Sequence, residues 1–89
     1  MIHITIRVSG KVQGVNFRFS ARQEAEELGL AGFVKNEPDG SVYIEVEGFF
    51  EQVDKFVEWC KEGPARANVQ NVMTQESELK NLIGFEIRR

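Results

Sequence analysis

Two segments of the chain alternate apolar and polar side chains residue by residue, and this leaves few folds open to it. The first segment runs from Ile2 to Val8 and the second from Val42 to Glu47. Because successive side chains of a β-strand point to opposite faces of a sheet, each segment predicts a strand with one buried and one open face. A sheet made of such strands is covered by other elements on one face only.

Two further segments repeat their apolar residues at helical spacing. The repeated residues are Phe17, Ala21, Ala25 and Leu28 in the first segment, and Val53, Phe56, Val57 and Cys60 in the second. This spacing predicts two amphipathic helices, one starting at Phe17 and one over about residues 50–62. Gly29 and Gly63-Pro64 are the stop signals, because glycine adopts a left-handed cap without strain and proline cannot continue a helix.

The remaining segments complete the order of elements. Residues 31–36, 69–75 and 85–88 have the composition of strands, residues 76–82 are polar and loop-like, and Pro38-Asp39-Gly40 predicts a turn. The order β-α-β-β-α-β with a short final strand predicts an α+β fold, the ferredoxin-like α/β sandwich, with an antiparallel sheet and two helices on one face. We expect residues 1–89 to form a single domain.

The charge balance favours a small anion as partner. The net charge of the chain is −3, which disfavours nucleic acid and anionic membranes as main partners. Lys11, Arg18 and Arg22 nevertheless fall within twelve residues of one another. A local positive patch on an acidic protein suits a small ligand better than a polymer.

Cysteine usage and the N-terminal segment indicate a cytoplasmic protein. Cys60 is the only cysteine, so no intramolecular disulfide can form, as is usual in a reducing compartment. The N-terminal residues alternate and lack the apolar run of a signal peptide, and no window is long enough to span a membrane. We expect a monomer in the cytoplasm.

The stretch from Gly10 to Arg18, with the sequence GKVQGVNFR, joins the first strand to the first helix. Gly10 and Gly14 allow a positive φ and a close approach of the backbone to a ligand. Amide groups in such a turn, together with the free amides of a helix start, form an anion site. Arg18 adds a guanidinium fork that matches two phosphate oxygens. The stretch therefore predicts a phosphate site, against the plainer alternative of a tight turn with a surface arginine.

The glycine pattern also excludes two common nucleotide sites. A Walker A loop needs Gly-x-x-x-x-Gly-Lys-Ser/Thr and a dinucleotide fingerprint needs Gly-x-Gly-x-x-Gly, and neither occurs in the chain. The stretch therefore predicts a site for a small phosphate-bearing ligand, and no Mg²⁺-nucleotide motif explains it.

The stretch from Gly10 to Arg18 resembles the first signature of the acylphosphatase family, and the stretch from Gly32 to Val42 resembles the second. The resemblance extends over essentially the whole chain, down to residues 84–88. It implies hydrolysis of acyl phosphates to a carboxylate and inorganic phosphate, with no cofactor and no metal. The phosphate-binding residues that it implies are Arg18 and the loop residues Gln13, Gly14, Val15, Asn16 and Phe17. It also implies that Asn36 orients the attacking water.

The chemistry of the other candidate residues agrees with water as the nucleophile. His3, the only histidine, alternates onto the open sheet face, where we expect a surface side chain. Cys60 has core spacing and is expected to be buried and inert. No His, Cys, Asp or Glu cluster has metal-ligand spacing. The carboxamide of Asn36 both donates and accepts hydrogen bonds, so it can orient a water without titrating; an asparagine that only caps the hairpin turn is the alternative.

Supporting roles are expected for four neighbouring residues. We expect the side chains of Gln13 and Asn16 to face solvent and the ring of Phe17 to lie in the core. Ser41 is expected to hydrogen-bond near Asn36 and to fix its rotamer.

Two other functions remain open at this point. Ferredoxin-like domains bind RNA through aromatic residues on the open sheet face, but that face carries two glutamates and few aromatics here. The second is a non-catalytic accessory domain that binds phosphate or carbamoyl phosphate, since acylphosphatase-like domains also occur within larger carbamoyl-transferring enzymes. Turnover, as opposed to phosphate binding alone, distinguishes a hydrolase from such an accessory domain.

Overall fold

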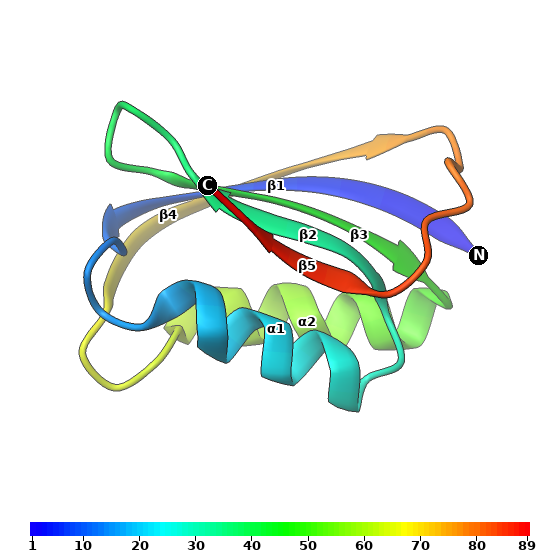
Figure 1. Ribbon diagram of the computed structural model, residues 1–89, viewed down its shortest axis with the longest axis horizontal. Helices are drawn as coiled ribbons and strands as arrows, with labels where there is room; N and C mark the ends of the chain where they lie inside the picture. Colours follow the sequence, from blue (N-terminus) through cyan, green and yellow to red (C-terminus); the bar gives the residue numbers. More distant parts are fainter.

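The computed structural model describes residues 1–89 and has two layers, a five-stranded sheet and two helices that cover one of its faces (Figure 1). The strands are β1 (Ile2–Lys11), β2 (Ala31–Asn36), β3 (Val42–Gly48), β4 (Asn68–Ser77) and β5 (Phe85–Arg88), and the helices are α1 (Phe17–Glu27) and α2 (Phe50–Glu62). The predicted ferredoxin-like α+β fold is confirmed. Neither helix is long and apolar enough to cross a membrane.

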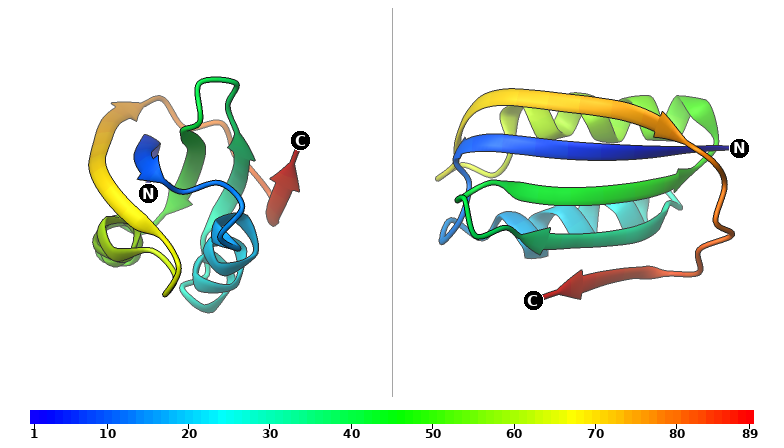
Figure 2. Two further views of the ribbon diagram at one scale, coloured as in Figure 1. Left: turned by 90° about the vertical axis from the view of Figure 1, so that its left-hand side faces the viewer. Right: turned by 90° about the horizontal axis from the view of Figure 1, so that it is seen from above.

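The strands are ordered β4-β1-β3-β2-β5 across the sheet. All neighbours pair antiparallel except β5, which runs parallel to β2. The sheet is therefore mixed, and the prediction of an antiparallel sheet is wrong at this edge. The reason is the connection at residues 78–84, which carries the chain from β4 to the opposite edge of the sheet, so that β5 runs back in the direction of β2 (Figure 2).

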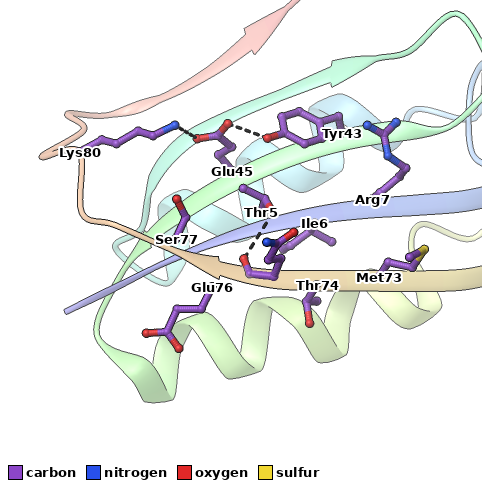
Figure 3. A pocket seen from close by; sticks show the side chains of 11 residues that line it. Thr5, Ile6, Arg7, Tyr43, Glu45, Met73, Thr74, Glu76, Ser77 and Lys80 are labelled. Carbon is purple, nitrogen blue, oxygen red and sulfur yellow. Dashed lines mark hydrogen bonds and ion pairs between the residues drawn. The ribbon is translucent and has the colours of Figure 1, made fainter.

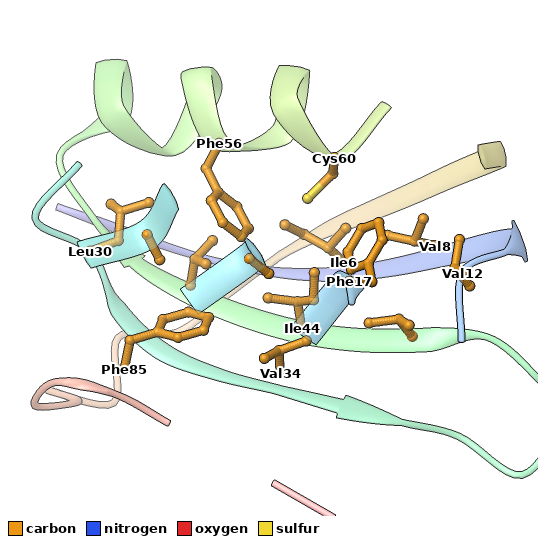
Figure 4. Packing of buried hydrophobic residues seen from close by; sticks show 14 of the residues in the cluster. Ile6, Val8, Val12, Phe17, Leu30, Val34, Ile44, Phe56, Cys60 and Phe85 are labelled. Carbon is orange, nitrogen blue, oxygen red and sulfur yellow. The ribbon is translucent and has the colours of Figure 1, made fainter. Parts of the chain in front are cut away.

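The hydrophobic core lies between the sheet and the two helices (Figure 4). The sheet contributes the apolar side chains of the alternating strands, among them Ile6, Val8, Val42, Ile44 and Val46. The helices contribute Phe17, Ala21, Ala25, Val53, Phe56 and Cys60. The alternation and the helical spacing predicted each of these positions. Burial also raises the pKa of the Cys60 thiol, which keeps it unreactive as expected.

His3 departs most clearly from the sequence expectation, because its side chain is fully buried and not at the surface. Its ring nitrogens lie 2.8 Å from a carboxylate oxygen of Glu45 and 2.9 Å from one of Glu47. The connection at residues 78–84 closes over this part of the open face, where the backbone amides of Lys80 and Leu82 donate to Glu47 at 2.6 and 2.8 Å. The alternation puts His3 on the correct face, but a segment distant in sequence covers it.

The carboxylate of Glu47 holds this connection in place, and this predicts a pH-dependent stability. Burial acts to raise the pKa of Glu47, but the amides of Lys80 and Leu82 and the side chain of His3 outweigh it, so the pKa lies below its ordinary value of 4.5. A carboxyl group with a lowered folded-state pKa stabilises the fold above its unfolded value, and this stabilisation is lost as the pH falls through the folded pKa. Glu47→Gln is therefore expected to cost about 3 kcal/mol of unfolding free energy at pH 7. It should also flatten the loss of stability below pH 4.5.

Urea denaturation of the wild type and the variant at pH 7 and pH 3.5 measures both effects. Glu78→Ala is the matched control, because it removes an exposed carboxylate from the same connection. Equal stability of Glu47→Gln and Glu78→Ala at pH 7 would show that Glu47 does not hold the connection.

Candidate active site

The turn between β1 and α1 uses left-handed backbone at two positions. The φ angles are +72° at Gly14 and +68° at Asn16. Asparagine tolerates this region better than most residues, and a Cβ added at Gly14 would meet no atom within 4 Å. The glycine at position 14 therefore serves the backbone conformation and not the packing.

This backbone leaves a cluster of amide groups free at the start of α1. The amides of residues 13–16 donate no hydrogen bond within the protein, and Ser20 is the first residue of α1 whose amide donates along the helix, to the carbonyl of Asn16 at 3.2 Å. The first turn of α1 has no acidic residue, and no side chain caps it. Free amides at the positive end of a helix dipole form a site for an anion.

Gln13 faces inward, so the expectation that its side chain faces solvent is wrong. Its side-chain nitrogen donates to the backbone carbonyls of Glu37 and Ser41, both at 2.8 Å. The reason is topological: β1 and β2 both run antiparallel to β3, so the β1–α1 loop and the β2–β3 turn leave the sheet at the same end (Figure 1). Gln13 thereby fastens the β1–α1 loop, residues 12–16, to the turn that follows Asn36.

A pocket of about 240 Å³ lies where the loop, the start of α1 and the end of β2 meet. It is lined by Val12, Gly14, Asn16, Phe17, Arg18, Phe19 and Asn36. Arg18 and Asn36 thus share one pocket although they belong to different layers of the fold. Among the other predicted loop residues, Gln13 and Val15 do not line the pocket: Gln13 holds the loop, and the side chain of Val15 is buried in the core.

Arg18 is half-buried and is the unpaired cation of this pocket. Its guanidinium donates one hydrogen bond, at 3.3 Å, to the backbone carbonyl of Arg88 at the end of β5. None of the ion pairs of the chain includes Arg18. A guanidinium has five N–H donors, so most of them remain for a ligand beside the free amides of the loop.

Asn36 is the last residue of β2 and pairs with Val42 across the sheet. The expectation that Ser41 fixes its rotamer is wrong, because the Ser41 hydroxyl donates to Asp39 at 2.6 Å and accepts from Arg7 at 3.0 Å. A turn aspartate commonly binds the residue two positions later, and here the Ser41 side chain and backbone amide both bond Asp39 and lower its pKa. The carboxamide of Asn36 is left free of hydrogen bonds to the protein.

Sequence reasoning misses two residues that line the pocket, Val12 and Phe19. Val12 gives no signal in the sequence beyond its place between the two glycines. Phe19 does give one, because it is an aromatic residue next to Arg18 at a position where the helical spacing predicts a polar surface residue.

A larger hollow of about 520 Å³ lies on the open face of the sheet, and it shares no lining residue with the smaller pocket (Figure 3). Its one buried carboxylate is already paired: Tyr43 donates to Glu45 at 2.7 Å and Lys80 to Glu45 at 3.1 Å. Burial and the Glu45 carboxylate raise the pKa of Tyr43 to about 12. Size alone favours this hollow, but the free amides and the unpaired arginine favour the smaller pocket as the site of phosphate chemistry.

The fold and the smaller pocket together define a small ferredoxin-like domain whose β1–α1 loop presents free amide groups beside an unpaired arginine. The family model described as acylphosphatase matches residues 4–87. The chain belongs to the acylphosphatase family. It is an enzyme, a hydrolase that acts on acyl phosphates and releases inorganic phosphate.

Individual relatives agree with this assignment. The chain is 50% identical over 82 residues to an acylphosphatase of Acaryochloris marina, covering 92% of this chain and 88% of the relative. It superimposes on the crystal structure of acylphosphatase from Bacillus subtilis with a TM-score of 0.98 at 39% identity, with both chains fully covered.

The same fold also occurs as part of a much longer chain. The structure of full-length HypF in its phosphate- and nucleotide-bound form matches 99% of this chain with a TM-score of 0.89 and 30% identity, but the match covers only 12% of HypF. The acylphosphatases are matched over most of their own length. The acylphosphatases are also more similar in sequence, at 50% and 39% identity against 30% for HypF, so a non-catalytic accessory domain is not favoured.

Proposed function

We propose that this acylphosphatase binds the phosphoryl group of its substrate with the free amides of residues 13–18 and the guanidinium of Arg18, and that Asn36 orients the attacking water. The observation that carries the proposal is the single pocket shared by Arg18, Asn36 and the β1–α1 loop of residues 12–16, the proposed anion-binding loop. Each charge-assisted hydrogen bond to the phosphoryl oxygens contributes roughly 1.5–3 kcal/mol. Phosphoryl transfer depends mainly on positioning and electrostatic stabilisation, which such a set of donors supplies.

The reaction needs no protein nucleophile. The oxygen of a water held by Asn36 attacks phosphorus, and the bond between phosphorus and the acyl oxygen breaks as the carboxylate leaves. The carboxylate is a good leaving group, so no strong general acid is required. A phosphoryl oxygen of the substrate takes the proton of the water, because the carboxamide of Asn36 holds that water without titrating.

The proposal includes independence from metal ions, since the donors come from the protein itself. No group of three His, Cys, Asp or Glu side chains is placed to hold an ion. Hydrolysis of benzoyl phosphate, followed by its ultraviolet absorbance, is expected to proceed at the same rate with and without EDTA. A rate that EDTA abolishes and a divalent cation restores would contradict the proposal. Binding of inorganic phosphate without any turnover would instead leave the chain as an anion-binding module.

The same proposal covers the setting in which the enzyme works. Residues 1–89 act as one catalytic domain and as a monomer, since a single copy of the chain supplies Arg18, Asn36 and the loop amides that the proposed mechanism uses. The net negative charge supports a small-molecule substrate without nucleic-acid or membrane partners. The unpaired, buried thiol of Cys60 supports a cytoplasmic location.

A further inference from the structure

Phe19 is an aromatic side chain that α1 does not bury. The helix turns Phe17, Ala21 and Ala25 toward the core. Because residues of an α-helix are spaced at 3.6 per turn, Phe19 lies roughly 200° around the helix from Phe17 and cannot reach that core. Its side chain is 57% exposed. Among the exposed large apolar side chains of the protein, Phe19 is the one that lines the pocket of Arg18.

The geometry of a helix directs this ring toward the anion-binding loop. Side chains on a helix lean toward its N-terminus, and Phe19 is the third residue of α1. Arg22, one turn later, leans back in the same way, and its guanidinium carbon lies 5.5 Å from the centre of the Phe19 ring. Arg22 does not line the pocket. This cation–π contact therefore restrains the ring from outside and leaves its pocket side free.

The pocket has room for more than the phosphoryl group. A single water needs about 10–15 Å³ of such volume, against about 240 Å³ in this pocket. In phosphoryl transfer the attacking and leaving oxygens lie roughly in line through phosphorus. Asn36 enters the pocket from the sheet and Phe19 from the helix layer. With the water at Asn36, on the sheet side of the pocket, the in-line leaving group points toward the helix layer, which carries Phe19.

We propose that the ring of Phe19 is the surface on which the acyl group of the substrate packs, so that the enzyme favours acyl phosphates with aromatic or bulky apolar acyl groups over small ones. This inference rests on the proposed function, which puts the phosphoryl group at Arg18 and the water at Asn36. A flat aromatic ring gains most from an aromatic partner that stacks on it with an offset. Phe19 thereby determines specificity and does not take part in the bond-breaking step.

The test compares two substrates that differ only in the acyl group, benzoyl phosphate and acetyl phosphate. Phe19→Ala is expected to lower kcat/KM about tenfold for benzoyl phosphate and less than about twofold for acetyl phosphate. Phe19→Tyr keeps a flat ring and should retain the wild-type preference. Phe50→Ala is the matched control, because Phe50 is 66% exposed on the first turn of the other helix and does not line the pocket. It should change neither value.

Binding of non-hydrolysable analogues makes the test independent of turnover. Calorimetry with benzoylphosphonate and acetylphosphonate should show the same loss of preference in Phe19→Ala, while the affinity for inorganic phosphate is unchanged. An unchanged benzoyl-to-acetyl ratio in both assays would overturn the role of Phe19 and leave the proposed function intact. A wild type that binds both phosphonates but turns over neither acyl phosphate would overturn the proposed function, while the phosphonate ratio still decides the role of Phe19.

Discussion

Arg18→Ala is expected to lower kcat/KM for benzoyl phosphate by about 10³-fold. The guanidinium can make two charge-assisted hydrogen bonds to the phosphoryl oxygens, each worth roughly 1.5–3 kcal/mol. Losing both bonds lowers kcat/KM by a factor between about 10² and 10⁴, since each 1.36 kcal/mol of transition-state stabilisation corresponds to a tenfold change in rate. No other cation lines the pocket, so nothing else in it supplies the missing charge. Steady-state kinetics with benzoyl phosphate measure the effect.

Two further variants complete this test: the first separates the fork of Arg18 from its charge, and the second is a matched control. Arg18→Lys should recover little of the activity, because an ammonium group cannot bind two oxygens in one plane. Arg66→Ala removes an exposed arginine that does not line the pocket and should leave kcat/KM close to the wild-type value. Near-normal kinetics of Arg18→Lys would mean that a point charge suffices and that the bidentate contact is not formed.

The second large effect is expected for Asn36→Ala, which should lower kcat by about 10²–10³-fold. This is the size of the loss when one donor to a transition state is removed. The variant leaves the loop amides and Arg18 in place, so it removes the group proposed to orient the water and keeps those proposed to hold the phosphoryl group. The measurement is kcat at saturating benzoyl phosphate.

The alternative for Asn36 is a purely structural role at the end of β2, and a stability measurement distinguishes the two. Asn71→Ala, at an exposed position on β4, is the matched control. If Asn36 orients the water, its alanine variant unfolds at nearly the same urea concentration as Asn71→Ala and only its kcat falls. A near-normal kcat for Asn36→Ala would contradict the mechanism.

Local sequence patterns predicted most of the fold. The bounds of β2, α2 and β5 agree with the structure, since each has strand-like composition or helical spacing bounded by turn residues. The strand predicted at residues 69–75 extends to Asn68–Ser77 in β4, and the loop after it is correspondingly shorter. As an edge strand with mostly exposed side chains, β4 carries little of the alternation by which a strand is recognised.

Two features of the fold depend on contacts between distant segments, and the sequence does not reveal them. The parallel pairing of β5 with β2 and the burial of His3 both follow from the path of residues 78–84 across the end of the sheet. A polar segment in the sequence predicts a surface loop, and it gives no indication of the strand that the loop crosses.

The predictions for the site show the same difference between local patterns and contacts of distant segments. Arg18 and Asn36 were predicted from their chemistry and their motifs, and the structure brings them to one pocket. The inward bonds of Gln13 and the turn bonds of Ser41 were predicted wrongly, because both depend on how closely the β1–α1 loop approaches the β2–β3 turn. No local pattern encodes that distance.

The proposed mechanism assigns the phosphoryl group to Arg18 and the attacking water to Asn36. Calorimetric titration of the wild type, Arg18→Ala and Asn36→Ala with inorganic phosphate tests this division of roles most directly, because phosphate binding requires the first role and not the second. We expect Asn36→Ala to bind phosphate as tightly as the wild type and Arg18→Ala to show no measurable binding. Wild-type affinity in Arg18→Ala, or an equal loss of affinity in both variants, would contradict it.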